Sequence, residues 1–198
     1  MLQFIAQINN KYSVAELAQM AIEGGCHWIE LDLPEASDDF VRATALELKE
    51  LCVETGTFLT IADRPEVARE AGLHGVQLRG ANASRAAAVR DELGAEAIIG
   101  IEAANAAAVL NIQNLDIDYA TLPLGMPVAE VRQIVETIRK ADMSLPIVAR
   151  GEFTPDEAIE MMVAGANGIA VGSAISDSPD PAESTRRLLD ALKAVQQA

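Results

Sequence analysis

The feature that most constrains this chain is a regular alternation of short apolar runs with longer amphipathic segments. Eight runs rich in β-branched residues have the length of buried strands: residues 2–8, 27–33, 58–62, 75–79, 97–101, 119–122, 145–149 and 168–171. The segments between them place apolar residues at helical spacing, as do Leu46, Leu48, Leu51 and Cys52, which we expect on one helix face. Eight strand–helix units with short connections predict an α/β fold, a single (β/α)8 TIM barrel, formed as one domain by residues 1–198. An open doubly wound sheet is the structural alternative.

Helix-start signals support this division of the chain. Ser13 has Glu16 three residues on, which is a capping-box pattern. Ser84, Thr154 and Asp180 stand at similar positions before amphipathic segments. We therefore expect helices to begin directly after these polar residues.

Charge and composition exclude several classes of protein. The chain has 15 Lys and Arg against 30 Asp and Glu, a formal net charge of −15, so we expect neither nucleic acid nor a membrane surface as partner. No run reaches the roughly 18 apolar residues that span a bilayer, and residues 1–10 show no export signal, which predicts a cytoplasmic protein. Cys26 and Cys52 lack the spacing of a metal or redox pair and are expected to be buried thiols.

In a barrel, the active site lies at the carboxyl ends of the strands. The two histidines, His27 and His74, fall at strand starts, so they are expected at the opposite end. Acidic residues gather instead at the strand ends: Glu30, Asp32, Asp63, Glu102 and Glu152. Such an acidic mouth could hold a cationic or amino-bearing substrate. Equally, its acids could pair across the mouth with basic residues, namely Arg64, Arg79 and Arg150.

The last two strand ends suggest an anion site. Loops after strands seven and eight of many barrels, with the start of a short extra helix, form a phosphate cradle. Arg150, Gly151, Gly172 and Ser173 stand at these positions and are the candidate phosphate-binding residues. Glycines at strand-to-helix turns need no ligand to explain them, however, and Glu152 adds a negative charge where an anion would sit.

Six segments, in chain order, resemble those of the thiamine phosphate synthase and thiazole tautomerase family. Residues 59–64, LTIADR, resemble an apolar run ending in Asn-Asp-Arg, and residues 168–175, GIAVGSAI, resemble Gly-Val-Ala-Val-Val-Ser-Ala-Ile. The other four segments are residues 21–33, 75–82, 98–102 and 146–153. Together, the six segments follow the family's order and cover nearly the whole chain.

The resemblance implies a function in thiamine biosynthesis. The family's synthase, a transferase, joins a pyrimidine diphosphate to a thiazole phosphate and releases pyrophosphate with the help of Mg²⁺. On matching positions, it implies that Asp63 binds the metal, that Arg64 stands beside it, and that Gly151 and Ser173 hold a phosphate. It also implies a small phosphorylated substrate and, because members of the family often self-associate, a homodimer.

Other positions depart from the family pattern. The Gln and Arg of strand two become Glu30 and Asp32, the following Lys becomes Pro34, and the second metal-binding Asp becomes Asn82. Glu102 replaces a Ser, Ala62 replaces an Asn, and the Thr-rich loop after strand six is missing. Because a diphosphate needs cationic clamps, these changes make efficient synthase activity doubtful. The tautomerase needs a histidine in the mouth, where neither histidine is expected.

Three functions therefore remain open, with Glu30, Asp63, Arg64 and Glu102 as the candidate catalytic residues. The first is a thiamine phosphate synthase-like protein. The second is a diverged barrel enzyme that acts on another small molecule, for which the acidic mouth suggests a cation. The third is a ligand-binding relic without catalysis.

Overall fold

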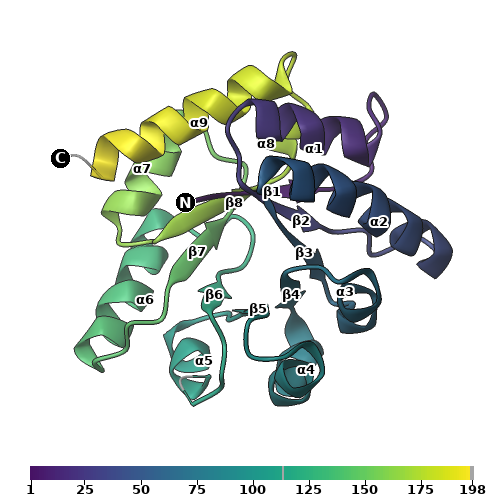
Figure 1. The fold of residues 1–198 in the computed structure, drawn as a ribbon. Helices are drawn as coiled ribbons and strands as arrows, with labels where there is room; N and C mark the ends of the chain where they lie inside the picture. Colours follow the sequence, from purple (N-terminus) through teal and green to yellow (C-terminus); the bar gives the residue numbers. More distant parts are fainter. Residues whose placement is uncertain (113, 197–198) are drawn as a thin grey trace.

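The computed structural model describes residues 1–112 and 114–196 and shows a closed parallel barrel surrounded by helices (Figure 1). The strands are β1 (Leu2–Ala6), β2 (Trp28–Leu31), β3 (Phe58–Ala62), β4 (Gly75–Leu78), β5 (Ile98–Glu102), β6 (Tyr119–Thr121), β7 (Ile147–Arg150) and β8 (Gly168–Val171). They follow one another in chain order around the barrel, and β1 closes it by pairing with β8, where Leu2 lies opposite Ile169. The predicted (β/α)8 barrel is confirmed, and the open sheet is excluded.

Helices connect the strands on the outside of the barrel (Figure 1). They are α1 (Val14–Glu23), α2 (Asp38–Thr55), α3 (Pro65–Ala71), the 3₁₀ helix η1 (Gly80–Arg85), α4 (Ala86–Leu93), α5 (Ala106–Asn111), α6 (Val128–Lys140), α7 (Pro155–Val163), α8 (Ser173–Ser176) and α9 (Pro181–Gln196). In the described part of the chain, none of them combines the length and apolar character needed to cross a membrane.

Alternate residues of each strand face two different layers. Along β1, Leu2, Phe4 and Ala6 belong to the large core between strands and helices. Ile5 belongs to a smaller cluster inside the barrel, with Tyr119, Val148 and Ala170. The interior also contains buried polar side chains, in contrast to the branched apolar residues that usually fill a TIM barrel. This polar interior lies directly beneath the mouth.

Three of the four predicted helix starts are confirmed. Ser13 and Thr154 form complete capping boxes with Glu16 and Glu157, and the Asp180 carboxylate accepts a hydrogen bond from the Glu183 backbone N–H. The fourth is wrong, because Ser84 lies inside η1 and α4 begins after Arg85. The tight 3₁₀ turn takes up the residues that precede α4.

The buried face of α2 differs from the expectation. Its buried residues are Val41, Thr44, Ala45, Leu48 and Cys52, which lie three or four positions apart. Leu46 is 52% exposed, so its assignment to this face was wrong. Leu46 is two residues before Leu48 and therefore points to a different side of the helix. Cys26 and Cys52 are buried free thiols, as predicted.

Candidate functional site at the barrel mouth

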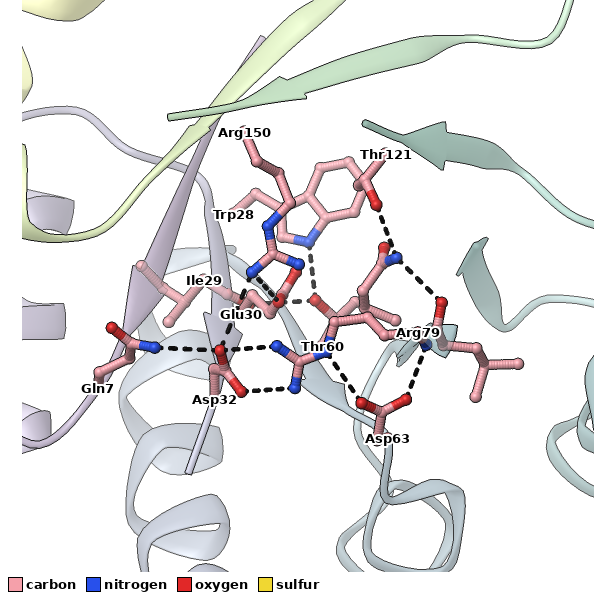
Figure 2. A network of polar contacts seen from close by, with 12 residues as sticks. Gln7, Trp28, Ile29, Glu30, Asp32, Thr60, Asp63, Arg79, Thr121 and Arg150 are labelled. Atoms are coloured by element: carbon pink, nitrogen blue, oxygen red, sulfur yellow. Dashed lines mark hydrogen bonds and ion pairs between the residues drawn. The ribbon is translucent and has the colours of Figure 1, made fainter. Parts of the chain in front are cut away.

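Arg79 is the centre of an ion-pair network at the carboxyl ends of β2, β3 and β4 (Figure 2). Its Nη1 and Nη2 donate to the two oxygens of Asp32, at 3.0 and 2.8 Å. Its Nε donates to Oδ2 of Asp63 at 2.9 Å. Gln7, just after β1, also donates to Asp32, at 3.1 Å. A single guanidinium thus neutralises one buried and one half-buried carboxylate.

The backbone of Asp63 sets the direction of its carboxylate. Asp63 has a φ of 55°, in the left-handed region that few residues other than glycine adopt, although Asp tolerates it better than most. Its Oδ1 accepts hydrogen bonds from the Arg79 backbone N–H, at 2.8 Å, and from Asn82 Nδ2, at 3.1 Å. The turn after β3 therefore aims Asp63 at the loop after β4.

Arg150 forms a second, deeper ion pair. It ends β7, is 7% exposed, and brings Nη2 within 3.5 Å of Glu30 and 3.9 Å of Asp32. Glu30 lies on β2 and is fully buried (Figure 2). Burial raises the pKa of Glu30 to about 7, although the positive charge of Arg150 acts in the opposite direction. Glu30 is consequently able to change its protonation state near neutral pH.

Asp63 is the residue that the family resemblance implies for Mg²⁺, and its surroundings do not fit a divalent cation. Both of its oxygens already accept hydrogen bonds, and Arg79 places a positive charge against Oδ2. Its neighbour Asn82 offers an NH₂ group rather than a carboxylate. Across residues 1–112 and 114–196, no group of three or more His, Cys, Asp or Glu side chains could hold a metal.

The predicted phosphate cradle already holds a carboxylate of the chain itself. Oε2 of Glu152 accepts a hydrogen bond of 2.5 Å from the Ala174 backbone N–H, in the first turn of α8. Oε1 lies 3.5 Å from the position that a Cβ on Gly172 would take. The Glu152 carboxylate therefore lies beside the turn formed by Gly172 and Ser173, where the sequence suggested an anion.

Gly151 has a packing role in this structure. A Cβ placed on Gly151 would lie 2.4 Å from the ring of Phe153, which is buried. The glycine therefore lets the Phe153 ring pack against the backbone after β7. This contact explains the glycine without a phosphate.

The remaining candidates lie at different distances from the network. Arg64 turns away from it, because its guanidinium pairs with Asp38 at the start of α2. Glu102 ends β5 and is half-buried, and Ser173 is exposed at the start of α8. His74 lies at the start of β4, where its Nδ1 accepts a hydrogen bond from the Leu59 backbone N–H. The histidines are at the opposite end of the strands from the mouth, as expected.

Sequence reasoning missed the leading role of Arg79 and the contribution of Gln7. Arg79 was recognised only as a pairing partner for the acids. Arg79 comes directly after the fourth strand, just as Asp32 comes directly after the second and Asp63 directly after the third. This shared position was the signal that could have identified Arg79. Gln7 follows a strand in the same way, but a neutral side chain gives no charge pattern to notice.

The closed barrel of eight parallel strands, with its helices outside, defines the class of this protein as a single (β/α)8 barrel. A family model described as thiamine monophosphate synthase matches residues 2–175. The chain belongs to this family, which confirms the resemblance seen in the sequence.

Individual relatives agree with this assignment. The thiamine-phosphate synthase of Bacteroides fragilis (strain YCH46) is 34% identical, over 96% of this chain and 98% of the relative. That of Natronomonas pharaonis is 32% identical, over 92% of this chain and 89% of the relative. A solved thiamine phosphate pyrophosphorylase from Pyrococcus furiosus has a TM-score of 0.87 at 24% identity, covering 98% of this chain and 96% of that one. At that identity, the solved structure supports the fold alone.

Proposed function

We propose that this chain acts in thiamine biosynthesis as a diverged thiamine phosphate synthase-like protein. It binds a small, phosphorylated molecule of that pathway at the barrel mouth, and its own condensation of a pyrimidine diphosphate with a thiazole phosphate is weak or absent. One observation carries this proposal: Arg79, a cation of the mouth, is bound on three sides by Asp32 and Asp63.

The electrostatic reason is a competition for cations. A diphosphate carries several negative charges and is normally held by unpaired Arg and Lys side chains. Here Arg79 and Arg150 already face Asp32, Asp63 and Glu30. A unit like-charge contact at 4 Å costs about 4 kcal/mol at the effective dielectric of a protein surface. A diphosphate entering this mouth meets these acids as well as the arginines.

The test is a product assay with purified protein, the pyrimidine diphosphate, the thiazole phosphate and Mg²⁺. We expect no thiamine phosphate above a control without protein. A variant that restores four positions of the family pattern, with Glu30→Gln, Asp32→Arg, Pro34→Lys and Asn82→Asp, is expected to gain measurable product. A matched variant with four exposed substitutions, Glu35→Gln, Asp39→Asn, Glu54→Gln and Glu70→Gln, is expected to gain none. Turnover by the unchanged protein that Asp63→Ala abolishes would establish a working synthase and reject the proposal.

The acidic character of the mouth supports a second candidate, a cationic or amino-bearing ligand. Glu152 fills the turn at Gly172, which leaves less room for a phosphate, while Glu30, Asp32 and Asp63 outnumber their arginine partners. A thermal-shift screen with thiamine intermediates, simple amines and divalent metals separates the two candidates. Stabilisation by phosphorylated intermediates alone favours the first, and stabilisation by amines alone favours the second.

Three further properties belong to the same proposal. We propose that residues 1–198 form one domain, that two copies associate, and that the protein works in the cytoplasm. Sedimentation at equilibrium tests the association, because a dimer has twice the chain mass of 21.0 kDa. A mass of one chain at micromolar concentration would contradict it.

A further inference from the structure

Below the ion-pair network, the barrel interior contains buried polar atoms that lack hydrogen-bond partners. Within the part of the chain that the structure describes, they include both carboxylate oxygens of Glu30, Oε1 of Gln77 and Nη1 of Arg150. The Tyr119 hydroxyl and the Gln3 amide face each other in the same interior. These side chains come from β1, β2, β4, β6 and β7 and are all less than a tenth exposed. Buried polar groups without partners are costly, so these atoms mark the place where a proton or a bound group would have the largest effect.

Among the described residues, neither carboxylate oxygen of Glu30 accepts a hydrogen bond, and the ion pair of Glu30 with Arg150 is long, at 3.5 Å. A proton on Glu30 would convert one of these acceptors into a donor. A fully buried carboxylate that accepts no hydrogen bond is costly to ionise, so this position favours the neutral form of Glu30.

Arg150 connects this interior to the mouth. Its Nη2 lies between Glu30, at 3.5 Å, and Asp32, at 3.9 Å, while Nη1 has no partner. Ionised Glu30 holds the guanidinium and cancels its charge. Once Glu30 is neutral, Asp32 is the remaining ion-pair partner of Arg150 among the described residues. Asp32 is already shared with Arg79 and Gln7, so Arg150 can bind another anion.

We propose that Arg150 is the binding residue for a small oxyanion at the barrel mouth and that a proton on Glu30 opens this site. This proposal rests on the proposed function because it concerns the same mouth. It adds the condition under which a negatively charged ligand binds there. The ligand class is a tetrahedral oxyanion, such as a sulfate or the phosphate group of an ester, which a guanidinium binds through paired N–H groups.

Other charged groups also face Glu30 and bear on its protonation. Those that raise its pKa are the acids Asp32 and Asp63, and those that lower it are Arg150 and Arg79. Tyr119 faces it from β6, and burial keeps that hydroxyl neutral by raising its pKa. The neutral side chains of Gln3 and Gln77 face the same interior. Burial has the largest effect on Glu30 and raises its pKa to about 7.

Sulfate binding measured across pH tests this proposal, because sulfate keeps the same charge between pH 6 and pH 8. If only the form with neutral Glu30 binds, its population falls about tenfold over that interval for a pKa of about 7. We expect the dissociation constant for sulfate, measured by calorimetry at constant ionic strength, to be about tenfold lower at pH 6 than at pH 8.

The variant Glu30→Gln isolates the role of the carboxyl group. We expect it to bind sulfate at pH 8 as tightly as the unchanged protein does at pH 6, with no dependence on pH. Glu35→Gln, on the exposed loop after β2, serves as the matched control and is expected to keep the tenfold dependence. Equal affinity of the unchanged protein at the two pH values would overturn the proposal. So would a pH dependence that persists in Glu30→Gln, since it would then arise from another group.

Two further measurements keep the proposal testable if Glu30→Gln does not fold. Carboxyl-carbon NMR of the unchanged protein follows Glu30 directly, and linkage requires bound sulfate to raise its titration midpoint. A midpoint that sulfate leaves unchanged rejects the coupling. A crystal structure with sulfate is expected to show the ion on Arg150, and a sulfate bound only elsewhere rejects the assigned residue. None of these outcomes depends on turnover of thiamine intermediates, so the two proposals fail separately.

Discussion

At the scale of individual residues, the charge of the mouth depends on how two arginines, Arg79 and Arg150, pair with three acids, Glu30, Asp32 and Asp63. Asp32 is 3% exposed, and its buried carboxylate is compensated by contacts with Arg79, Arg150 and Gln7. A buried carboxylate that loses its main partner is more costly than an exposed one, because water cannot replace the lost interaction. The consequences of single substitutions should therefore differ sharply with burial.

Arg79→Met is expected to lower the free energy of unfolding by about 3 kcal/mol, because it leaves Asp32 buried with weaker compensation. Urea denaturation measures this loss. Arg85→Met is the matched control, since Arg85 pairs with Glu66 where both side chains are exposed, and we expect a loss below about 1 kcal/mol. Equal losses in the two variants would show that the buried network contributes no more than a surface pair.

The raised pKa of Glu30 predicts a pH dependence of stability. The folded state binds the proton at a pKa of about 7 and the unfolded chain near 4.5, so the contribution of Glu30 is greatest below pH 4.5 and is lost as pH rises to 7. Relative to Glu30→Gln, the unchanged protein should lose on the order of 3 kcal/mol over this range. Urea denaturation of both proteins at several pH values measures the difference, and a difference that does not vary with pH would contradict the raised pKa.

Among the strands and helices, the connections after β7 and β8 show that one sequence pattern can occur in two different packing environments. Gly151 and Gly172 both follow strands at the mouth, and both fit a phosphate cradle in sequence. In the structure, Phe153 packs on Gly151 and Glu152 caps the first turn of α8. The same two glycines therefore face different steric demands.

Gly151→Ala is expected to destabilise the protein by about 1–3 kcal/mol, because the new methyl group would overlap the buried Phe153 ring. In Gly172→Ala, the nearest atom to the new Cβ is 3.5 Å away, which is an ordinary contact, so the loss should be smaller. Thermal or urea unfolding of the two variants provides the comparison. A larger loss for Gly172→Ala would mean that its backbone conformation, rather than packing, controls this turn.

In the whole molecule, closure of the barrel stabilises the folded state, whereas the excess negative charge destabilises it. Closure gives every strand two neighbours and leaves no exposed sheet edge. A net charge of −15 on 198 residues makes the folded state repel itself. Salt screens such repulsion over distances of about 10 Å at 0.1 M.

Raising NaCl from about 0.05 to 0.5 M is therefore expected to raise the urea midpoint of unfolding, because screening relieves the repulsion among surplus acids. The effect should be monotonic and should appear in a single cooperative transition. A midpoint that falls with salt would mean that exposed pairs such as Arg42–Glu70 stabilise the fold more than the surplus charge destabilises it.

Local patterns were sufficient for the barrel, the capping boxes at Ser13 and Thr154, and the placement of the histidines away from the mouth. Strand and helix periodicity, cap residues and strand ends are properties of neighbouring residues, so they can be recognised along the chain. Errors arose where a local signal was weak, as at Ser84, where a 3₁₀ turn precedes the helix.

Three-dimensional packing was needed to establish which cation meets which acid. Arg79 reaches Asp32 across 47 positions of sequence, Arg64 turns to Asp38 instead of the mouth, and Glu152 reaches the Ala174 backbone. These pairings depend on strand register, on rotamers and on the left-handed turn at Asp63, none of which leaves a local pattern. The sequence therefore shows which charged residues lie at the mouth. Which of these charges neutralise one another depends on the distances between strands, and the chemistry of the site depends on that pairing.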